Sequence, residues 1–135
     1  MAGELNGAVV AIPYAVANAV TNAADVDLTK PGGNTITVMP KAGSVVGLLV
    51  NATADLTAGS ATFEVHKDGT ELAEESAPVL TLDDTHQEIY GLVRSRALRF
   101  AAGDGLGVSY SSTTDAAPTN TNDYDAVLLV EFDID

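Results

Sequence analysis

Hydrophobic and polar residues alternate along the last third of the chain. In the segment YDAVLLVEFDID, every second residue from Ala126 to Ile134 is apolar, whereas Asp125, Glu131 and Asp133 fall between them. Successive side chains of a strand point to opposite faces, so a period of two over this length predicts a β-strand. The segment Leu106–Tyr110 alternates in the same way. We expect these two segments to be the closing strands of an antiparallel sandwich.

Shorter apolar segments precede them and are separated by turn residues. Asp68-Gly69 predicts a two-residue hairpin, because a type I′ turn needs positive φ at both positions. With the closing pair, the segments make about eight or nine short strands and no convincing helix, which is typical of a β-sandwich or barrel. The earlier strands are expected at Asn34–Met39, Ser44–Thr53, Ser60–Lys67, Thr70–Ala73, Val79–Leu82 and His86–Val93.

The N-terminal lead, residues 1–33, is harder to assign. Pro13 interrupts its apolar run and removes a ladder donor, which predicts an edge strand or an extended arm. We favour an edge strand at Val9–Val16 over a helix through Tyr14–Ala24, and a loop at Asp25–Gly33. Residues 34–135 then form the main part of a single domain.

Composition and charge exclude several classes of function. The chain of 135 residues is 46% hydrophobic but has no Trp and only 5% aromatic residues, so we expect Val, Leu, Ile and Ala to build the core. A net charge of −13 repels phosphate backbones and anionic membranes. The absence of Cys excludes disulfides and thiolate chemistry and favours a prokaryotic or viral origin. The N-terminus has no basic segment typical of a signal peptide, and we expect a soluble protein that is not exported.

Candidate catalytic and metal-binding residues are few. His66 and His86 lie in different segments, without partners at the spacing of a triad or zinc site, and we interpret both as surface or interface residues. The acidic pairs Asp83-Asp84 and Asp123/Asp125 could ligate calcium, but we favour their interpretation as solvated loop residues. A glycosidase would need aromatic residues that stack on the sugar beside its two carboxylates, and this sequence has few aromatic residues. We therefore predict a protein that is not an enzyme and has no cofactor and no metal.

Several short motifs together resemble a known group of domains. These are Ala42-Gly43-Ser44 before an apolar strand, a strand ending in Lys67-Asp68-Gly69, the segment FAAGD (Phe100–Asp104), and an apolar closing strand. Over about Thr35–Phe132, the chain resembles the small jelly-roll domains of bacteriophage capsid decoration, or cement, proteins and related fibre domains. Their topology is similar to that of trimeric complement-type and tumour-necrosis-factor-like jelly rolls.

The resemblance implies an all-β jelly-roll sandwich that binds the outside of a phage head as a homotrimer and stabilises it. The implied partners are the major capsid protein and further copies of this chain, without nucleic acid or membrane. The implied location is the outer surface of the virion, after synthesis in the bacterial host cytoplasm. The alternative is a receptor- or carbohydrate-binding domain of a phage fibre.

The outward side of two strands suggests how a trimer would form. Val127 and Leu129 share the side of the closing strand that carries its acids, and Ser44–Thr53 is apolar on both faces. A strand that is apolar on both faces needs a second cover. We therefore predict a trimer interface at Val127, Leu129, Val46 and Leu48.

Capsid contacts are expected elsewhere. Arg94, Arg96 and Arg99 are half of the six basic residues, and they either pair with acids of the same chain or contact another subunit through charge complementarity. Residues Met1–Asn6 precede the predicted edge strand and are free to reach the shell. The predicted capsid contacts are Glu4, Leu5, Asn6, Arg94 and Arg96.

Overall fold

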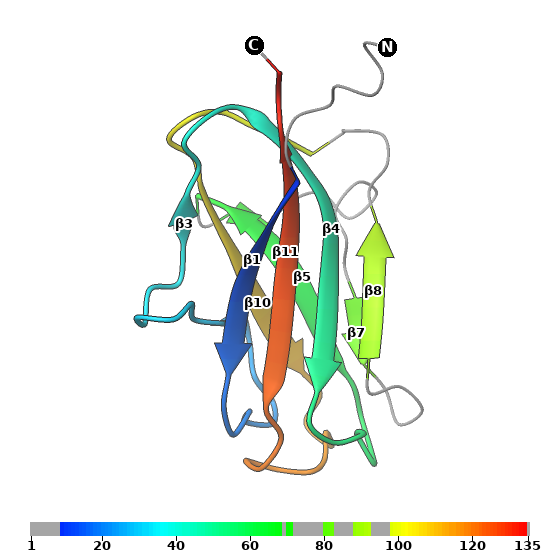
Figure 1. The fold of residues 1–135 in the computed structure, drawn as a ribbon. Coiled ribbons are helices and arrows are strands. Elements are labelled where there is room, and N and C mark those ends of the chain that lie inside the picture. The colour runs from blue at the N-terminus through cyan, green and yellow to red at the C-terminus, as the bar shows by residue number, and fades with distance from the viewer. Residues whose placement is uncertain (1–8, 69, 72–79, 83–87, 93–97, 135) are drawn as a thin grey trace.

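The computed structural model describes residues 9–68, 70–71, 80–82, 88–92 and 98–134. This part of the chain forms eleven strands and no helix, arranged as two facing sheets (Figure 1). Sheet A contains β1 (Val9–Val16), β4 (Gly43–Ala52), β8 (Glu88–Leu92), β9 (Arg99–Phe100) and β11 (Tyr124–Phe132). Sheet B contains β2 (Val26–Asp27), β3 (Thr37–Val38), β5 (Ala61–Lys67), β6 (Thr70–Glu71), β7 (Leu80–Leu82) and β10 (Gly105–Ser112).

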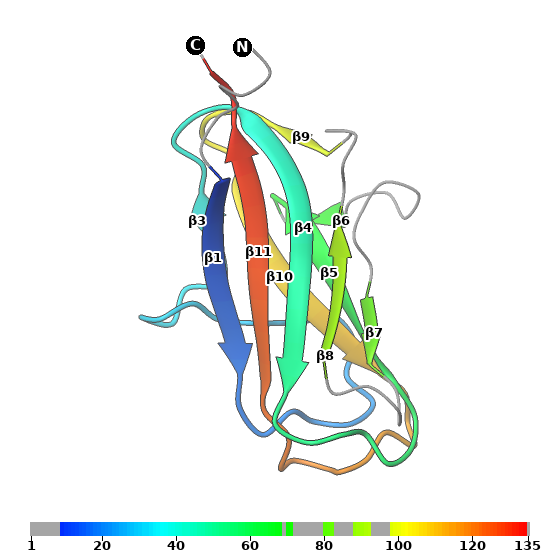
Figure 2. The same ribbon diagram turned by 45° about the vertical axis from the view of Figure 1, so that its right-hand side comes forward.

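The strand order is that of a jelly roll. Sheet A runs β1-β11-β4-β8, with β9 also paired to β4, and sheet B runs β2-β10-β5-β6, with β3 on β10 and β7 on β5 (Figure 2). The first strand therefore pairs with the last, β2 and β3 with β10, β4 with β8 and β9, and β5 with β6 and β7. A long antiparallel hairpin that is rolled into two layers, as in a jelly roll, gives such nested pairs of strands. The predicted all-β sandwich is confirmed, and its eleven strands occupy eight positions in the two sheets.

The core lies between the sheets, and the alternation in the sequence identifies much of it. Ala61, Phe63 and Val65 of β5 are fully buried, as are Leu106, Val108 and Tyr110 of β10. On β11, Ala126, Leu128 and Val130 are buried, whereas Ile134, beyond the end of the strand, is 55% exposed. The predicted faces of these strands are therefore confirmed up to the end of β11.

Aromatic side chains contribute more to the core than the composition suggested. Tyr14, Tyr110 and Phe63 are the largest fully buried side chains. The Phe63 and Tyr124 rings meet edge to face with centroids 5.1 Å apart, and Tyr110 and Tyr124 do so at 5.5 Å. This geometry is favoured by the ring quadrupoles. The expectation of an aliphatic core therefore holds only in part, because the few aromatic residues are concentrated inside.

A β-bulge in β4 changes which of its residues face the core. Leu129 of β11 pairs with Gly47, but the next residue, Val130, pairs with Val45, so Val46 has no position of its own in the register. An extra residue reverses the alternation. Leu48 and Val45 are therefore both buried against the core although three positions apart.

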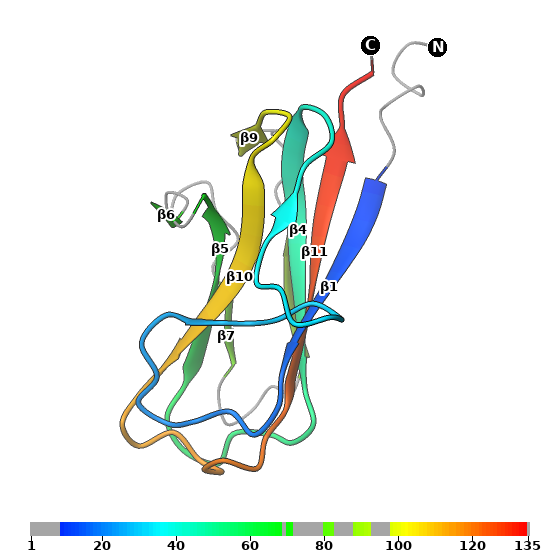
Figure 3. The ribbon, with the colours of Figure 1, turned by 90° about the vertical axis from the view of Figure 1, so that its left-hand side faces the viewer.

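The described part of the N-terminal lead, residues 9–33, is part of the sandwich. β1 is an edge strand of sheet A, as predicted, and pairs with β11 along its full length. The predicted loop at Asp25–Gly33 instead contains β2, and Leu28 within it is fully buried. The hydroxyl of Tyr14 on β1 donates to the carbonyl oxygen of Leu106 on β10 at 2.8 Å, which joins the two sheets. β1 and β2 thus lie within the two sheets, next to β11 and β10, and β1 can be followed beside β11 in Figure 3.

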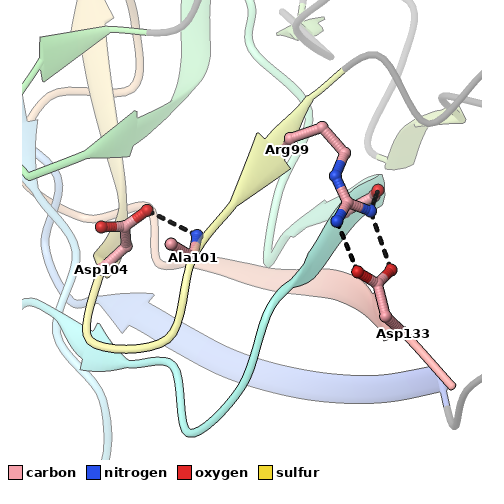
Figure 4. A network of polar contacts seen from close by, with 5 residues as sticks. Arg99, Ala101, Asp104 and Asp133 are labelled. Carbon is pink, nitrogen blue, oxygen red and sulfur yellow. Dashed lines mark hydrogen bonds and ion pairs between the residues drawn. The ribbon is translucent and has the colours of Figure 1, made fainter. Parts of the chain in front are cut away.

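The turn motifs of the sequence have the expected local geometry. Lys67 pairs with Thr70, which leaves a two-residue loop, and Asp68 has φ of 53°. In the segment FAAGD, Gly103 has φ of 93°, and the Asp104 carboxylate accepts a hydrogen bond from the Ala101 amide at 2.7 Å (Figure 4). Positive φ is available to Gly without steric cost, which explains its place in this turn.

Candidate interaction surface

The outer face of sheet A is arranged in rows that cross its strands. In one inner row, Val127 of β11 lies between Pro13 of β1 and Leu49 of β4. In the next row, Leu129 of β11 lies between Ala11 of β1 and Gly47 of β4. Directly opposed residues of antiparallel strands place their side chains on the same face, about 5 Å apart. We call Ala11, Pro13, Leu49, Val127 and Leu129 the apolar stripe.

The apolar stripe is open to solvent in the single chain. Leu49 is 39% exposed, Ala11 and Pro13 are exposed, and Val127 and Leu129 are half-buried. Val9, at the end of β1, extends the apolar surface and is 59% exposed. Contiguous exposed apolar surface on a soluble domain marks an interaction site.

Polar rows border the apolar stripe on both sides. In one, Ala15 lies opposite Asp125, which lies opposite Asn51, and both Asp125 and Asn51 are exposed. In the other, Glu131 lies between Ser44 of β4, which is buried, and Val9 of β1, which continues the apolar surface at this edge. An apolar centre with a polar rim is the usual anatomy of a protein–protein interface.

An ion pair closes the second polar row. Arg99 of β9, opposite Ser44, donates to Asp133 just beyond β11 through both terminal nitrogens, Nη1 at 2.8 Å and Nη2, and also donates to the Ser44 hydroxyl at 3.1 Å (Figure 4). The hydrogen bond with Asp133 raises the pKa of the Arg99 guanidinium. Of the two alternatives for the arginines, Arg99 therefore follows the first, pairing with an acid of its own chain.

The predicted trimer-interface residues fall into three groups. Val127 and Leu129 lie in the apolar stripe, and Val46 is half-buried at the bulge. Leu48 is fully buried in the core and is not available to a partner, so this part of the prediction is wrong. Strict alternation predicts that Leu48 and Val46 share the outer face of β4. The bulge turns Leu48 toward the core and leaves Leu49, which was not predicted, on the outer face.

The predicted capsid contacts lie outside the described residues. This applies to Glu4, Leu5 and Asn6 in the lead and to Arg94 and Arg96, as well as to His86 and Asp83-Asp84. Asp123 is described, and its carboxylate accepts a hydrogen bond from the Asn18 amide at 2.8 Å. Asp125 belongs to the polar rim.

A shallow hollow of about 480 Å³ adjoins the apolar stripe at the β1 edge. Pro13 and Val127 of the stripe line it, together with Lys30 and Asp125. Its walls thus combine apolar surface with one base and one acid. A side chain that projects from a neighbouring molecule has space here.

Three potential metal ligands meet on the outer face of sheet B. A carboxylate oxygen of Asp25, one of Glu64 and a ring nitrogen of His66 all lie within 4.8 Å of one another. Glu64 and His66 are alternate residues of β5 and share its outer face, whereas Asp25 comes from the segment before β2. The sequence analysis missed this cluster because Asp25 is far from the other two along the chain.

No membrane-spanning helix is found in the part of the chain that the structure describes. No protein-family model and no characterised protein matches the sequence.

A solved chain from a viral shell shares the fold of this chain. A chain of the cyanophage Pam1 capsid asymmetric unit is similar over 95% of this chain and 87% of that chain, with 16% identity and a TM-score of 0.54. A chain of turnip yellow mosaic virus covers 94% of this chain and 93% of its own length, with 15% identity and a TM-score of 0.43. At 16% sequence identity, the likeness to the cyanophage chain shows a shared fold alone.

Proposed function

We propose that this protein is a non-enzymatic structural component of a bacteriophage virion that decorates the outside of the head as a homotrimer and stabilises it. The observation that carries this proposal is the apolar stripe with its polar rim on the outer face of sheet A. A capsid chain with the same fold supports a virion role, and the resemblance of the turn motifs to decoration proteins supports the specific one.

Three copies packed through the apolar stripe would give each sheet A its second cover. The stripe is continuous over β1, β11 and β4, and its most exposed large side chain is Leu49. Covering a fully exposed Leu or Val contributes about 1.5–3 kcal/mol, and roughly half of that when the side chain is already half-buried. Several such side chains in each copy favour association without further polar contacts.

Charge opposes the trimer but is placed to limit the cost. Each chain carries −13, so three chains repel one another, and salt screens this repulsion. Two acids of β11, Asp125 and Glu131, lie in the rows that border the stripe and not within it. At the rim of an interface they remain hydrated.

Attachment to the shell would use a second set of residues. We propose the N-terminal residues Glu4, Leu5 and Asn6 together with Arg94 and Arg96 as the contacts with the major capsid protein. A bound trimer that bridges neighbouring shell subunits would stabilise the assembled shell, because a ligand that binds one state shifts the equilibrium toward it.

The direct test is co-sedimentation of the protein with intact heads of its phage. We expect the full chain to bind undecorated heads and to raise the temperature at which they rupture. A variant that lacks Met1–Asn6 should stay folded and trimeric but bind more weakly. A protein that is absent from purified virions and does not bind heads would contradict the proposal, and binding to host cells or glycans instead would favour a fibre domain.

A further inference from the structure

We propose that Asp25, Glu64 and His66 form a binding site for a divalent transition-metal ion such as Zn²⁺ on the outer face of sheet B. The three ligand atoms lie within 4.8 Å of one another. Ligand atoms around tetrahedral Zn²⁺ lie roughly 3.3 Å apart, given metal–ligand distances of about 2.0–2.2 Å. Small side-chain rotations are therefore sufficient to close the site.

The register of sheet B explains why these side chains converge. Glu64 lies opposite Ser109 on β10, and His66 lies opposite Gly107. The Thr35 carbonyl oxygen packs over Gly107, 2.8 Å from where a Cβ would lie. The small side chain of Ser109 lets ligands from the two sides of β10 approach each other across this position. The Ser111 hydroxyl, also on β10, accepts a hydrogen bond from the Asp25 amide at 3.0 Å, which places Asp25 beside the strand.

Two of the three ligands, Glu64 and His66, are packed, whereas Asp25 is exposed. Ser109 faces outward but is 0% exposed, and its hydroxyl contacts Nε2 of His66. Such a contact fixes the orientation of the ring, as hydrogen bonds to metal-bound histidines do. Glu64 and His66 are half-buried, and the Oε2 atom of Glu64 is shielded from solvent.

The ligand types select the metal. One imidazole nitrogen with two carboxylates suits Zn²⁺ and similar ions, whereas Ca²⁺ takes oxygen ligands only. A bound ion would link the segment before β2 to β5 across β10, and so hold three segments of sheet B together. This role does not depend on the proposed function in the virion.

Calorimetric titration of the chelator-stripped full chain with ZnCl₂ tests the site. We expect one equivalent to bind, and saturating Zn²⁺ to raise the midpoint of thermal unfolding by on the order of 10 °C. His66→Gln and Asp25→Asn should each weaken binding at least about tenfold, whereas Asp55→Asn, an exposed acid in the loop between β4 and β5, and His86→Gln should leave it unchanged. Circular dichroism of each variant checks the fold.

Three results of the titrations with Zn²⁺ and Ca²⁺ would overturn the site. The first is that the unmodified chain shows no saturable Zn²⁺ binding. The second is that His86→Gln weakens Zn²⁺ binding as much as His66→Gln does. The third is that CaCl₂ raises the midpoint of thermal unfolding as much as ZnCl₂ does. Co²⁺ provides a second measurement if His66→Gln does not fold. The unmodified chain should then show the visible absorption of a tetrahedral Co²⁺ site, and Asp25→Asn should lose it. A spectrum of hydrated octahedral Co²⁺ in the unmodified chain would also contradict the proposal.

Discussion

Val127 of β11 lies directly opposite Leu49 of β4 on the outer face of sheet A. The two residues that precede and follow Val127 in the chain, Ala126 and Leu128, point the other way and are buried between the sheets. The same strand therefore supplies both the core and the apolar stripe. This double role explains why an acidic protein keeps apolar residues on an open face.

A charge within the apolar stripe should separate the subunits. In Leu129→Glu, we expect association to weaken by at least about 10²-fold, because an apolar contact is lost and a carboxylate is buried in each copy. The variant should be a folded, strand-rich monomer by light scattering and circular dichroism. Thr114→Glu adds the same charge on an exposed loop and should remain associated. Equal masses for the two variants would contradict a role for the stripe.

The bulge in β4 predicts different effects for two neighbouring leucines. Leu48→Ala should lower the free energy of unfolding by about 2–5 kcal/mol, because it leaves a cavity in the core. Leu49→Ala should lower the stability of the monomer by less than about 1 kcal/mol and weaken association instead. Urea unfolding and light scattering of both variants separate these effects. The opposite assignment would show that β4 has no bulge.

Three buried tyrosines predict a loss of stability at alkaline pH. Burial raises the pKa of Tyr14, Tyr110 and Tyr124 above 10, and the neighbouring Tyr110 also raises that of Tyr124. Above pH 10 the unfolded chain releases protons that the folded chain retains, so stability is complete below pH 10 and falls as pH rises toward the folded values. Urea unfolding between pH 8 and pH 11.5 measures this loss.

Tyr124→Phe keeps the ring and removes the ionisable group, so it should reduce the alkaline loss. The absorbance of tyrosinate in the native protein gives an independent check. Ionisation of all four tyrosines near pH 10, with the sandwich still folded, would contradict the burial of these three hydroxyls.

Asn122 joins the two turns at one end of the sandwich. It is fully buried, accepts hydrogen bonds from the Thr53 hydroxyl and the Ala54 amide at 3.0 Å each, and donates to the Ala54 carbonyl oxygen at 2.9 Å. Asn122→Ala should therefore lower the free energy of unfolding by about 2–3 kcal/mol, since three hydrogen bonds, each contributing roughly 0.5–1.5 kcal/mol, are lost. Thr121→Ala, at an exposed position, should change it by less than about 0.5 kcal/mol. Equal urea midpoints for the two variants would contradict this role.

The sequence predicted the strands in which alternation is regular. The core faces of β5, β10 and β11 follow from a period of two, and the Asp68-Gly69 hairpin follows from its turn residues. Alternation failed at Leu48, because a single extra residue reverses the two faces of a strand. It also missed β2, because a two-residue strand is too short for a period to be seen.

The candidate sites depend on residues that are distant in the sequence. Pro13, Leu49 and Val127 meet in one row because the jelly roll places β1 and β4 on either side of β11. Asp25 approaches His66 because β2 and β5 flank β10. The outward position of the apolar residues Val127 and Leu129 was still predicted from the sequence, since they share a face of the closing strand with its acids.

The mass of the unmodified protein in solution tests the association through sheet A most directly. Light scattering at micromolar concentration and moderate salt should give three times the 13.8 kDa of one chain. The trimer should dissociate more readily at low ionic strength, where the repulsion between chains of −13 is less screened. A mass of 13.8 kDa under all these conditions would contradict the trimer and leave the apolar stripe to another partner.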